Sequence, residues 1–151
     1  MPDEQLQLRP FVQVACICQT PIIEQNGYIT VVRIMDRIAI PGFTPQMPPT
    51  PLQNLCLLIV LKSGLLRETH SIRVIPTSPS GKQGPAIVET GALFEGDERG
   101  TITAIPLPLT ASEEGLYWFD LFVEQDLITR IPLRLIYQRL PMPMQAPPQN
   151  G

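Results

Sequence analysis

Residues 115–137 read GLYWFDLFVEQDLITRIPLRLIY, and in this stretch two alternating apolar runs flank a short polar interruption. Such alternation is typical of β-strands, whose successive side chains point to opposite faces of a sheet. The stretch therefore predicts a β-hairpin. Its core face would hold Tyr117, Phe119, Leu121, Val123, Leu127, Thr129, Ile131, Leu133, Leu135 and Tyr137.

The length of the hairpin connection follows from this face assignment. Both apolar sets share one face only if the connection has an odd number of residues, which predicts Glu124-Gln125-Asp126 as the loop. A two-residue turn would set Leu121 opposite Ile128 and mismatch the pleat. The predicted register sets Asp120 opposite Arg130.

The outward face of the hairpin is too apolar for ordinary solvent-facing surface. It is a candidate interaction surface made of Leu116, Trp118, Asp120, Phe122, Arg130 and Arg134. Aromatic and arginine side chains are enriched at protein interfaces. We therefore expect a protein partner or a second copy of the chain at this face.

The rest of the chain also carries the period of strands, and no proline-free window has a helical apolar stripe. We expect strands at 10–19, 28–40, 54–62, 69–76, 86–94, 101–109, 115–124 and 127–138. Strands of this length and spacing predict an antiparallel β-sandwich, immunoglobulin-like or C2-like. A closed barrel is the alternative, but prolines within the predicted strands favour sheet edges or bulges.

Asn26-Gly27 predicts a two-residue type I′ turn in an N-terminal hairpin. A strict two-residue turn pairs Cys18 with Met35 and Cys16 with Arg37, which fits the apolar face poorly. We therefore expect a bulge or bend at Pro21 to reset the register. Asp36 and Arg37 interrupt an otherwise apolar strand and form a candidate polar pair. Structurally, the pair is interpreted as a strand-end ion pair or a backbone-capping carboxylate. The functional alternative is a polar contact at a binding surface.

Strand 54–62 is apolar on both faces, which indicates burial on both sides. Either another chain covers the second face or the chain itself does. We favour a cover by the proline-rich crossing 41–53 and the C-terminal tail, through Phe43, Met47, Met142 and Met144.

Composition limits the class of protein. The length of 151 residues predicts a single domain, which we place at residues 9–138. We expect an N-terminal extension at residues 1–8 and a flexible Pro/Met-rich tail at residues 139–151. A net charge of −3 without a basic stripe argues against nucleic acid. The longest apolar run, 55–61, is too short to cross a membrane, and no signal peptide is seen, so we expect a cytoplasmic protein.

Site chemistry is sparse in the sequence. The single histidine, His70, is expected to be a hydrogen-bonded strand residue, and Cys16, Cys18 and Cys56 to be reduced, buried thiols. Together these four side chains have the types of zinc ligands, but a Cys-x-Cys spacing within a strand argues against zinc. No nucleophile, phosphate-binding or dinucleotide-binding motif is found, so we expect no cofactor and no catalysis.

The order of features resembles a family of small bacterial proteins of unknown function. The resemblance rests on Asn26-Gly27 with residues 28–31, on 35–38, on GLYWF at 115–119 and on TRIPLRL at 129–135, and it extends over residues 8–138. It implies a β-sandwich and supplies no catalytic residues. Leu135 stands where that family often has valine.

Three functions are consistent with the sequence. The preferred hypothesis is a non-enzymatic protein-interaction or structural module that uses the outward hairpin face. The second is a small-ligand-binding sandwich with a pocket between the sheets or under residues 41–53. The third and weakest is an uncharacterised hydrolase or metalloenzyme, which would need polar residues clustered around His70 or Asp36.

Overall fold

The computed structural model describes residues 9–142, and every regular element in that part of the chain is a β-strand. Nine strands occur: β1 (Phe11–Ile23), β2 (Ile29–Ile34), β3 (Arg37–Gly42), β4 (Thr50–Pro51), β5 (Cys56–Thr77), β6 (Val88–Pro106), β7 (Thr110–Ala111), β8 (Gly115–Val123) and β9 (Asp126–Arg139). The all-β prediction is confirmed over these residues. None of them forms a helix that could span a membrane. The predicted extension 1–8, and residues 143–151 of the predicted tail, lie outside the described residues.

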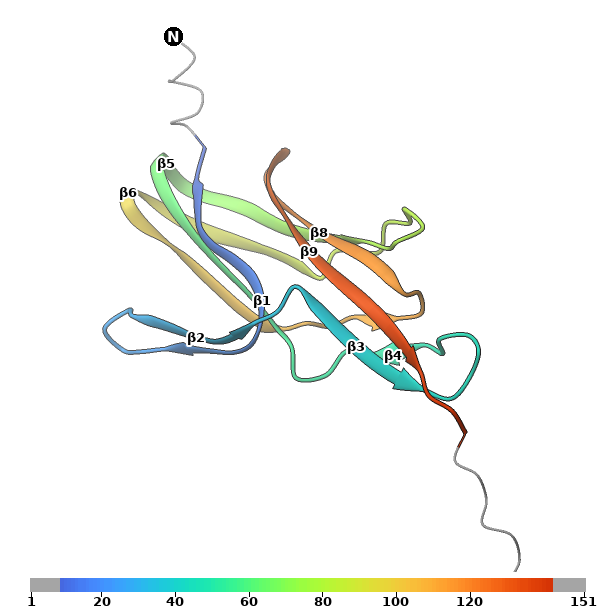
Figure 1. Ribbon diagram of the computed structural model, residues 1–151. Helices are drawn as coiled ribbons and strands as arrows, with labels where there is room; N and C mark the ends of the chain where they lie inside the picture. The colour runs from blue at the N-terminus through green and yellow to red at the C-terminus, as the bar shows by residue number, and fades with distance from the viewer. Residues whose placement is uncertain (1–8, 143–151) are drawn as a thin grey trace, which may run out of the picture.

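Two pairs of predicted strands are in fact single long strands. Predicted strands 54–62 and 69–76 are joined in β5, and 86–94 and 101–109 are largely joined in β6 (Figure 1). The ladder between β5 and β6 continues past Gly64, with irregularities on both sides of that residue. Gly64 and Asp97, which are partners in this ladder, both have left-handed backbone, with φ of 59° and 53°. Bulges of this kind bend a strand without ending it, so a segment that resembles a turn in the sequence is a bend.

Strand β5 links two halves of the main sheet. The strand order is β2-β1-β5-β8-β9-β3, and β6 pairs with β5 outside this path. Residues 56–62 of β5 pair with β1, whereas residues 72–77 pair with β8. The bend between them turns β8, β9 and β3 away from the plane of β1 and β2 (Figure 1).

The main sheet is mixed, because β3 runs parallel to β9. The prediction of a purely antiparallel sheet is wrong at this pair, and predicted strand 28–40 is interrupted after Ile34. The backbone N–H of Met35 donates to Ile17, and the carbonyl of Asp36 accepts from Arg134. The chain thus crosses from the β1 half to the β9 half within two residues, and this crossing sets the direction of β3.

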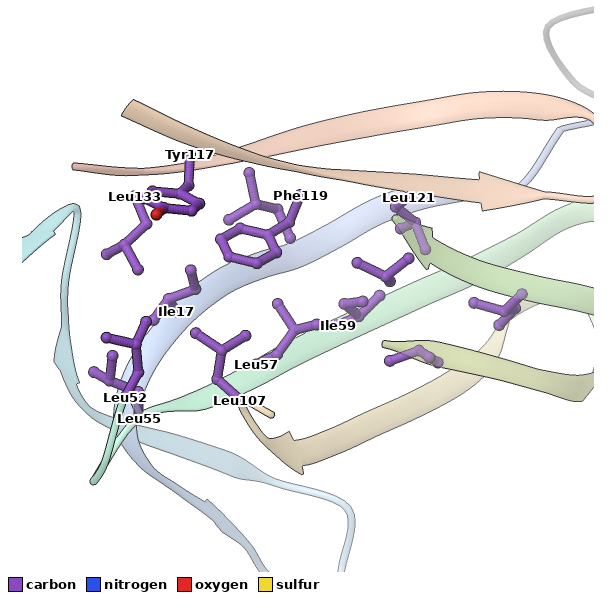
Figure 2. Close-up of a cluster of buried hydrophobic side chains, with 14 of the residues drawn as sticks. Ile17, Leu52, Leu55, Leu57, Ile59, Leu107, Tyr117, Phe119, Leu121 and Leu133 are labelled. Carbon is purple, nitrogen blue, oxygen red and sulfur yellow. The ribbon is translucent and has the colours of Figure 1, made fainter. Parts of the chain in front are cut away.

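The main core lies between the two halves of the sheet. Figure 2 shows side chains of β8 and β9 pointing toward side chains of β1 and β5. Phe119 and Leu57 are both 0% exposed, and full burial of such side chains contributes roughly 1.5–3 kcal/mol each. The predicted core face is confirmed for Tyr117, Phe119, Leu121, Val123, Ile131, Leu133, Leu135 and Tyr137.

The C-terminal hairpin has the predicted pairing in its middle but a different turn. Asp120 lies opposite Arg130, as expected. However, Val123 pairs with Asp126, so the turn has two residues rather than three, and a register shift follows Leu121. A bulge on β9 therefore brings the apolar residues of both strands to one face, which was the role expected of an odd-length loop. As a result Leu127 is 45% exposed, contrary to its predicted core position, and Ile128 packs partly against the core.

The N-terminal hairpin also differs from the prediction at its turn. Glu24 donates its backbone N–H to Tyr28, and Gly27 donates to Glu24, which leaves a three-residue loop with Gly27 at a φ of 87°. This arrangement matches a type I turn followed by a left-handed residue. The pairing of Cys18 with Ile34 follows from the extra loop residue. The ladder runs without a register shift through Pro21, where a bulge or bend was expected to reset the register.

The second apolar face of β5 is covered by the N-terminal hairpin. Leu58 and Val60 are 0% and 3% exposed and form a cluster with Cys16 and Cys18. Partly buried side chains of Ile29 and Val31 from β2 pack against this cluster.

The predicted cover of that face, by residues 41–53 and the tail, is wrong where the structure describes those residues. Met47 packs against the main core instead, while Phe43 and Met142 are exposed. Met144 lies outside the described residues. Instead, the β1–β2 hairpin covers the second apolar face of β5. No local pattern in the sequence indicates this arrangement.

Candidate functional site

Strands β5, β8 and β9 position the side chains of the candidate surface. Alternation along β8 buries Tyr117, Phe119 and Leu121, so the residues between them point away from the main core. We call this surface the aromatic–arginine face and define it by Arg73, Leu116, Trp118, Asp120, Phe122, Arg130 and Arg134.

Asp120, Arg130 and Trp118 form one connected group on this face. Nε of Arg130 donates a 2.7 Å hydrogen bond to Oδ1 of Asp120. The same guanidinium lies 4.5 Å from the centroid of the Trp118 ring, within the range of a cation–π contact. The Asp120 side chain is only 13% exposed, whereas that of Arg130 is 46% exposed. A largely buried carboxylate thus holds a surface arginine over the indole ring.

Phe122 has a similar partner that the sequence did not indicate. The guanidinium of Arg73 lies 5.4 Å from the Phe122 ring centroid, and its Nη2 also donates to the carbonyl oxygen of Glu124 at 3.3 Å. Arg73 and Phe122 are cross-strand partners between β5 and β8. Only the pairing of β5 with β8 reveals this contact, because the two residues are far apart in the sequence.

The candidate polar pair lies at the crossing between β2 and β3. Nε of Arg37 donates to Oδ1 of Asp36 at 3.3 Å, and both side chains are more than two-thirds exposed. An ion pair this exposed contributes about 0–1 kcal/mol to stability. Neither charge is buried, and the two side chains form the ion pair that one of the interpretations expected. Arg37 lies opposite Arg134 in the parallel ladder and extends the basic character of the face.

The charges on and beside the aromatic–arginine face are mainly basic. Arg37, Arg73, Arg130 and Arg134 contribute four positive charges. Asp36, which pairs with Arg37, Glu89, the cross-strand partner of Arg73, and Asp120 contribute three negative charges. The whole chain instead carries a net charge of −3. This surface therefore has a small excess of positive charge on a protein whose net charge is negative.

His70 lies at the other end of this half of the sheet. Its Nε2 donates to the carbonyl oxygen of Arg67 at 2.7 Å, since a carbonyl can only accept, and its Nδ1 is 3.5 Å from Oε1 of Glu124. The ring also lies 5.9 Å from that of Phe94. This arrangement fits a hydrogen-bonded strand histidine.

The cysteines lie in the outer cluster of the β1 half and not beside His70. Burial raises the pKa of Cys16, and burial raises that of Cys18 to about 11, so both thiols are protonated near neutral pH. Cys56 is the cross-strand partner of Cys18 and is partly exposed. Within residues 9–142, no group of three metal-ligating side chains converges.

Comparison with other proteins does not assign the chain to a group. No model of a protein family matches the sequence, and a search of curated proteins finds no match either.

Proposed function

We propose that this chain is a non-enzymatic protein-interaction module whose aromatic–arginine face binds an acidic segment of a partner protein. The observation that carries the proposal is the Asp120–Arg130–Trp118 group, in which a cation and an aromatic ring are fixed in place on a sheet face.

The type of side chain supports a protein ligand. Tryptophan and arginine dominate the residues that contribute most to binding at protein interfaces. Fixing them before binding lowers the loss of side-chain entropy on association. Trp118 and Phe122 each lie beside a guanidinium and are only partly exposed, so they are ordered without being covered.

The charge balance supports an acidic partner. Arg134 forms no salt bridge within residues 9–142 and is exposed. Arg73 adds a positive charge at the other end of the face, beside Phe122, whereas the charge of Arg37 is paired with Asp36. Complementary charge steers association and selects among partners, so a Glu- or Asp-rich segment with an apolar residue for Trp118 fits this face.

As part of the same proposal, the two halves of the sheet form an immunoglobulin-like or C2-like sandwich related to the small bacterial proteins that the sequence resembles. The hydroxyl of Tyr117 donates to the carbonyl oxygen of Glu113 at 2.8 Å. A tyrosine bonded to backbone a few residues upstream is a hallmark of immunoglobulin-like sandwiches, which supports that type.

Trp118 makes the proposal directly testable, because it is the only tryptophan in the chain. Peptides selected on the protein from a random display library are expected to be enriched in Asp and Glu. Their synthetic versions should change Trp118 fluorescence on binding, and Arg134→Glu should weaken them by about tenfold or more through like-charge repulsion. Arg99→Glu, at an exposed position of β6, is the matched control and should bind like wild type.

Two results would count against this function. The first is selected peptides with no acidic bias, or peptides whose affinity is the same for Arg134→Glu and wild type. The second is sedimentation showing a concentration-dependent dimer that Trp118→Ala abolishes, because a second copy would then cover the face.

A further inference from the structure

A groove lies where β2 crosses to β3, at the free edge of β3 and beside residues 50–55. Its volume is about 370 Å³. This is within the roughly 300–1,000 Å³ typical of small-molecule sites. The side chains that matter for its chemistry are Arg33, Met35, Ile38, Ile40, Leu52 and Asn54.

The floor of the groove is apolar. Leu52 is buried in the main core, and Met35, Ile38 and Ile40 are partly buried and pack against that core. An alkyl or aryl group resting on these side chains would remove apolar surface from water on both sides. The groove is therefore suited to a ligand with an apolar part.

The rim of the groove is polar and carries one charge. Arg33 is the only charged residue that lines it, and no Asp or Glu does. Arg33 forms no salt bridge within residues 9–142. The nearest acid in sequence, Asp36, accepts from Arg37 instead. A planar guanidinium without a carboxylate partner matches the two oxygens of a ligand carboxylate.

The backbone is strained at two residues of the rim. Arg33 has a φ of 56° and Asn54 a φ of 59°, in the left-handed region that favours glycine. Both residues line the same groove although they come from different segments. Strain of this kind persists only where the surrounding structure maintains it, and it is concentrated at functional sites.

We propose that this groove binds a small amphipathic carboxylate. Arg33 pairs with the carboxylate, the side-chain amide of Asn54 donates to it, and the apolar part of the ligand lies on Met35, Ile38 and Ile40. The site is separate from the aromatic–arginine face and does not depend on it.

Isothermal titration calorimetry on the full chain, with octanoate as the probe, tests this site. Octylamine and 1-octanol carry the same alkyl chain with a cationic or neutral head group. Octanoate is expected to bind in a one-to-one complex, and the other two to bind at least about tenfold more weakly.

Two glycine variants connect the affinity to the rim. Arg33→Gly and Asn54→Gly remove the side chain but suit the left-handed backbone, so both should remain folded. Arg33→Gly is expected to weaken octanoate binding about tenfold or more, and Asn54→Gly by a few-fold. Asp97→Gly, at a left-handed position of β6, and Trp118→Phe should both leave the affinity for octanoate unchanged.

Four results would overturn the proposal. One is no heat of binding with octanoate below its micelle-forming range. Another is octylamine or octanol binding as tightly as octanoate, which would make the groove a nonselective apolar surface. A third is undiminished octanoate affinity in folded Arg33→Gly. Loss of octanoate binding in Trp118→Phe would place the ligand on the other face.

Discussion

The carboxylate of Asp120 accepts a 2.7 Å hydrogen bond from Nε of Arg130, and the residues lie directly opposite each other in the β8–β9 ladder. The two ends of this pair differ in environment, because the Asp120 side chain is 13% exposed and that of Arg130 is 46% exposed. The buried charge depends on its partner more than the exposed charge does.

This asymmetry predicts unequal costs when either partner is removed. Arg130→Leu leaves a largely buried carboxylate unpaired and should lower the free energy of unfolding by about 2–3 kcal/mol. Asp120→Asn leaves a guanidinium that water can still reach, and should cost about 1 kcal/mol. Urea unfolding followed by far-ultraviolet circular dichroism measures both. Equal costs for the two single variants would contradict this coupling. So would a double variant whose loss of stability equals the sum of the two single losses.

Gly100 on β6 is a second sensitive position, because it pairs with Lys62 where β5 and β6 approach closely. A Cβ at Gly100 would overlap the carbonyl group of Leu61, with its carbon only 2.8 Å away. Backbone cannot move aside as a side chain can. Gly100→Ala should therefore lower the free energy of unfolding by about 3 kcal/mol or prevent folding.

Gly91→Ala is the matched change in the same strand. A Cβ at Gly91 would meet only the Cγ2 atom of Thr69, at 3.2 Å. The free energy of unfolding should therefore fall by less than about 1 kcal/mol. Thermal unfolding of both variants measures the difference. A Gly100→Ala protein as stable as Gly91→Ala would show that β5 and β6 are farther apart here.

The sequence could predict local pairing but not the bends and the distant pairing. Alternation in residues 115–137 identified both the core face and the partnership of Asp120 with Arg130, because a hairpin constrains both strands locally. Gly64 and Asp97 resemble turn residues in the sequence, yet they form a bulged bend, since hydrogen bonds on either side keep the ladder together. No local pattern distinguishes these two outcomes.

The same limit applies to the candidate sites. Alternation placed Trp118, Phe122 and Arg130 on one face correctly, but Arg73 could be added only from the pairing of β5 with β8. In the sequence, Arg33 resembles an ordinary strand residue. Only the structure shows that its backbone is left-handed and that it lines the same groove as Asn54. Contacts between strands distant in the sequence are set by topology, for which the single sequence has no signal.

The three thiols should differ in reactivity in the folded protein. Cys18 is fully buried with a pKa of about 11, and the pKa of Cys16 is also raised by burial, whereas Cys56 is partly exposed. Because the thiolate is the nucleophile, iodoacetamide should label Cys56 first and Cys18 last. Mass spectrometry of peptides after timed labelling measures the order. In urea all three should react at similar rates, which serves as the control, and early labelling of Cys18 in the native protein would contradict its burial.

Glu114 predicts a dependence of stability on pH. Nη2 of Arg139 donates to its Oε1 at 3.1 Å and the backbone N–H of Tyr137 donates to its Oε2 at 3.2 Å. These bonds lower the pKa of Glu114 below its ordinary value of 4.5. A carboxyl group whose pKa is lower in the folded state stabilises fully above its unfolded pKa, and this contribution is lost as the pH falls through the folded pKa.

The wild type should therefore be more stable than Glu114→Gln near neutral pH. The difference should shrink as the pH falls below 4.5, because the unfolded chain then takes up a proton at Glu114 while the folded chain, with its lower pKa, does not yet do so. Urea midpoints of the two proteins, measured across this pH range, give the difference directly. Glu98→Gln, at an exposed carboxylate without a salt bridge in residues 9–142, should show no such trend. A difference between wild type and Glu114→Gln that stays constant with pH would mean that the charge of Glu114 is not what Arg139 and Tyr137 bind.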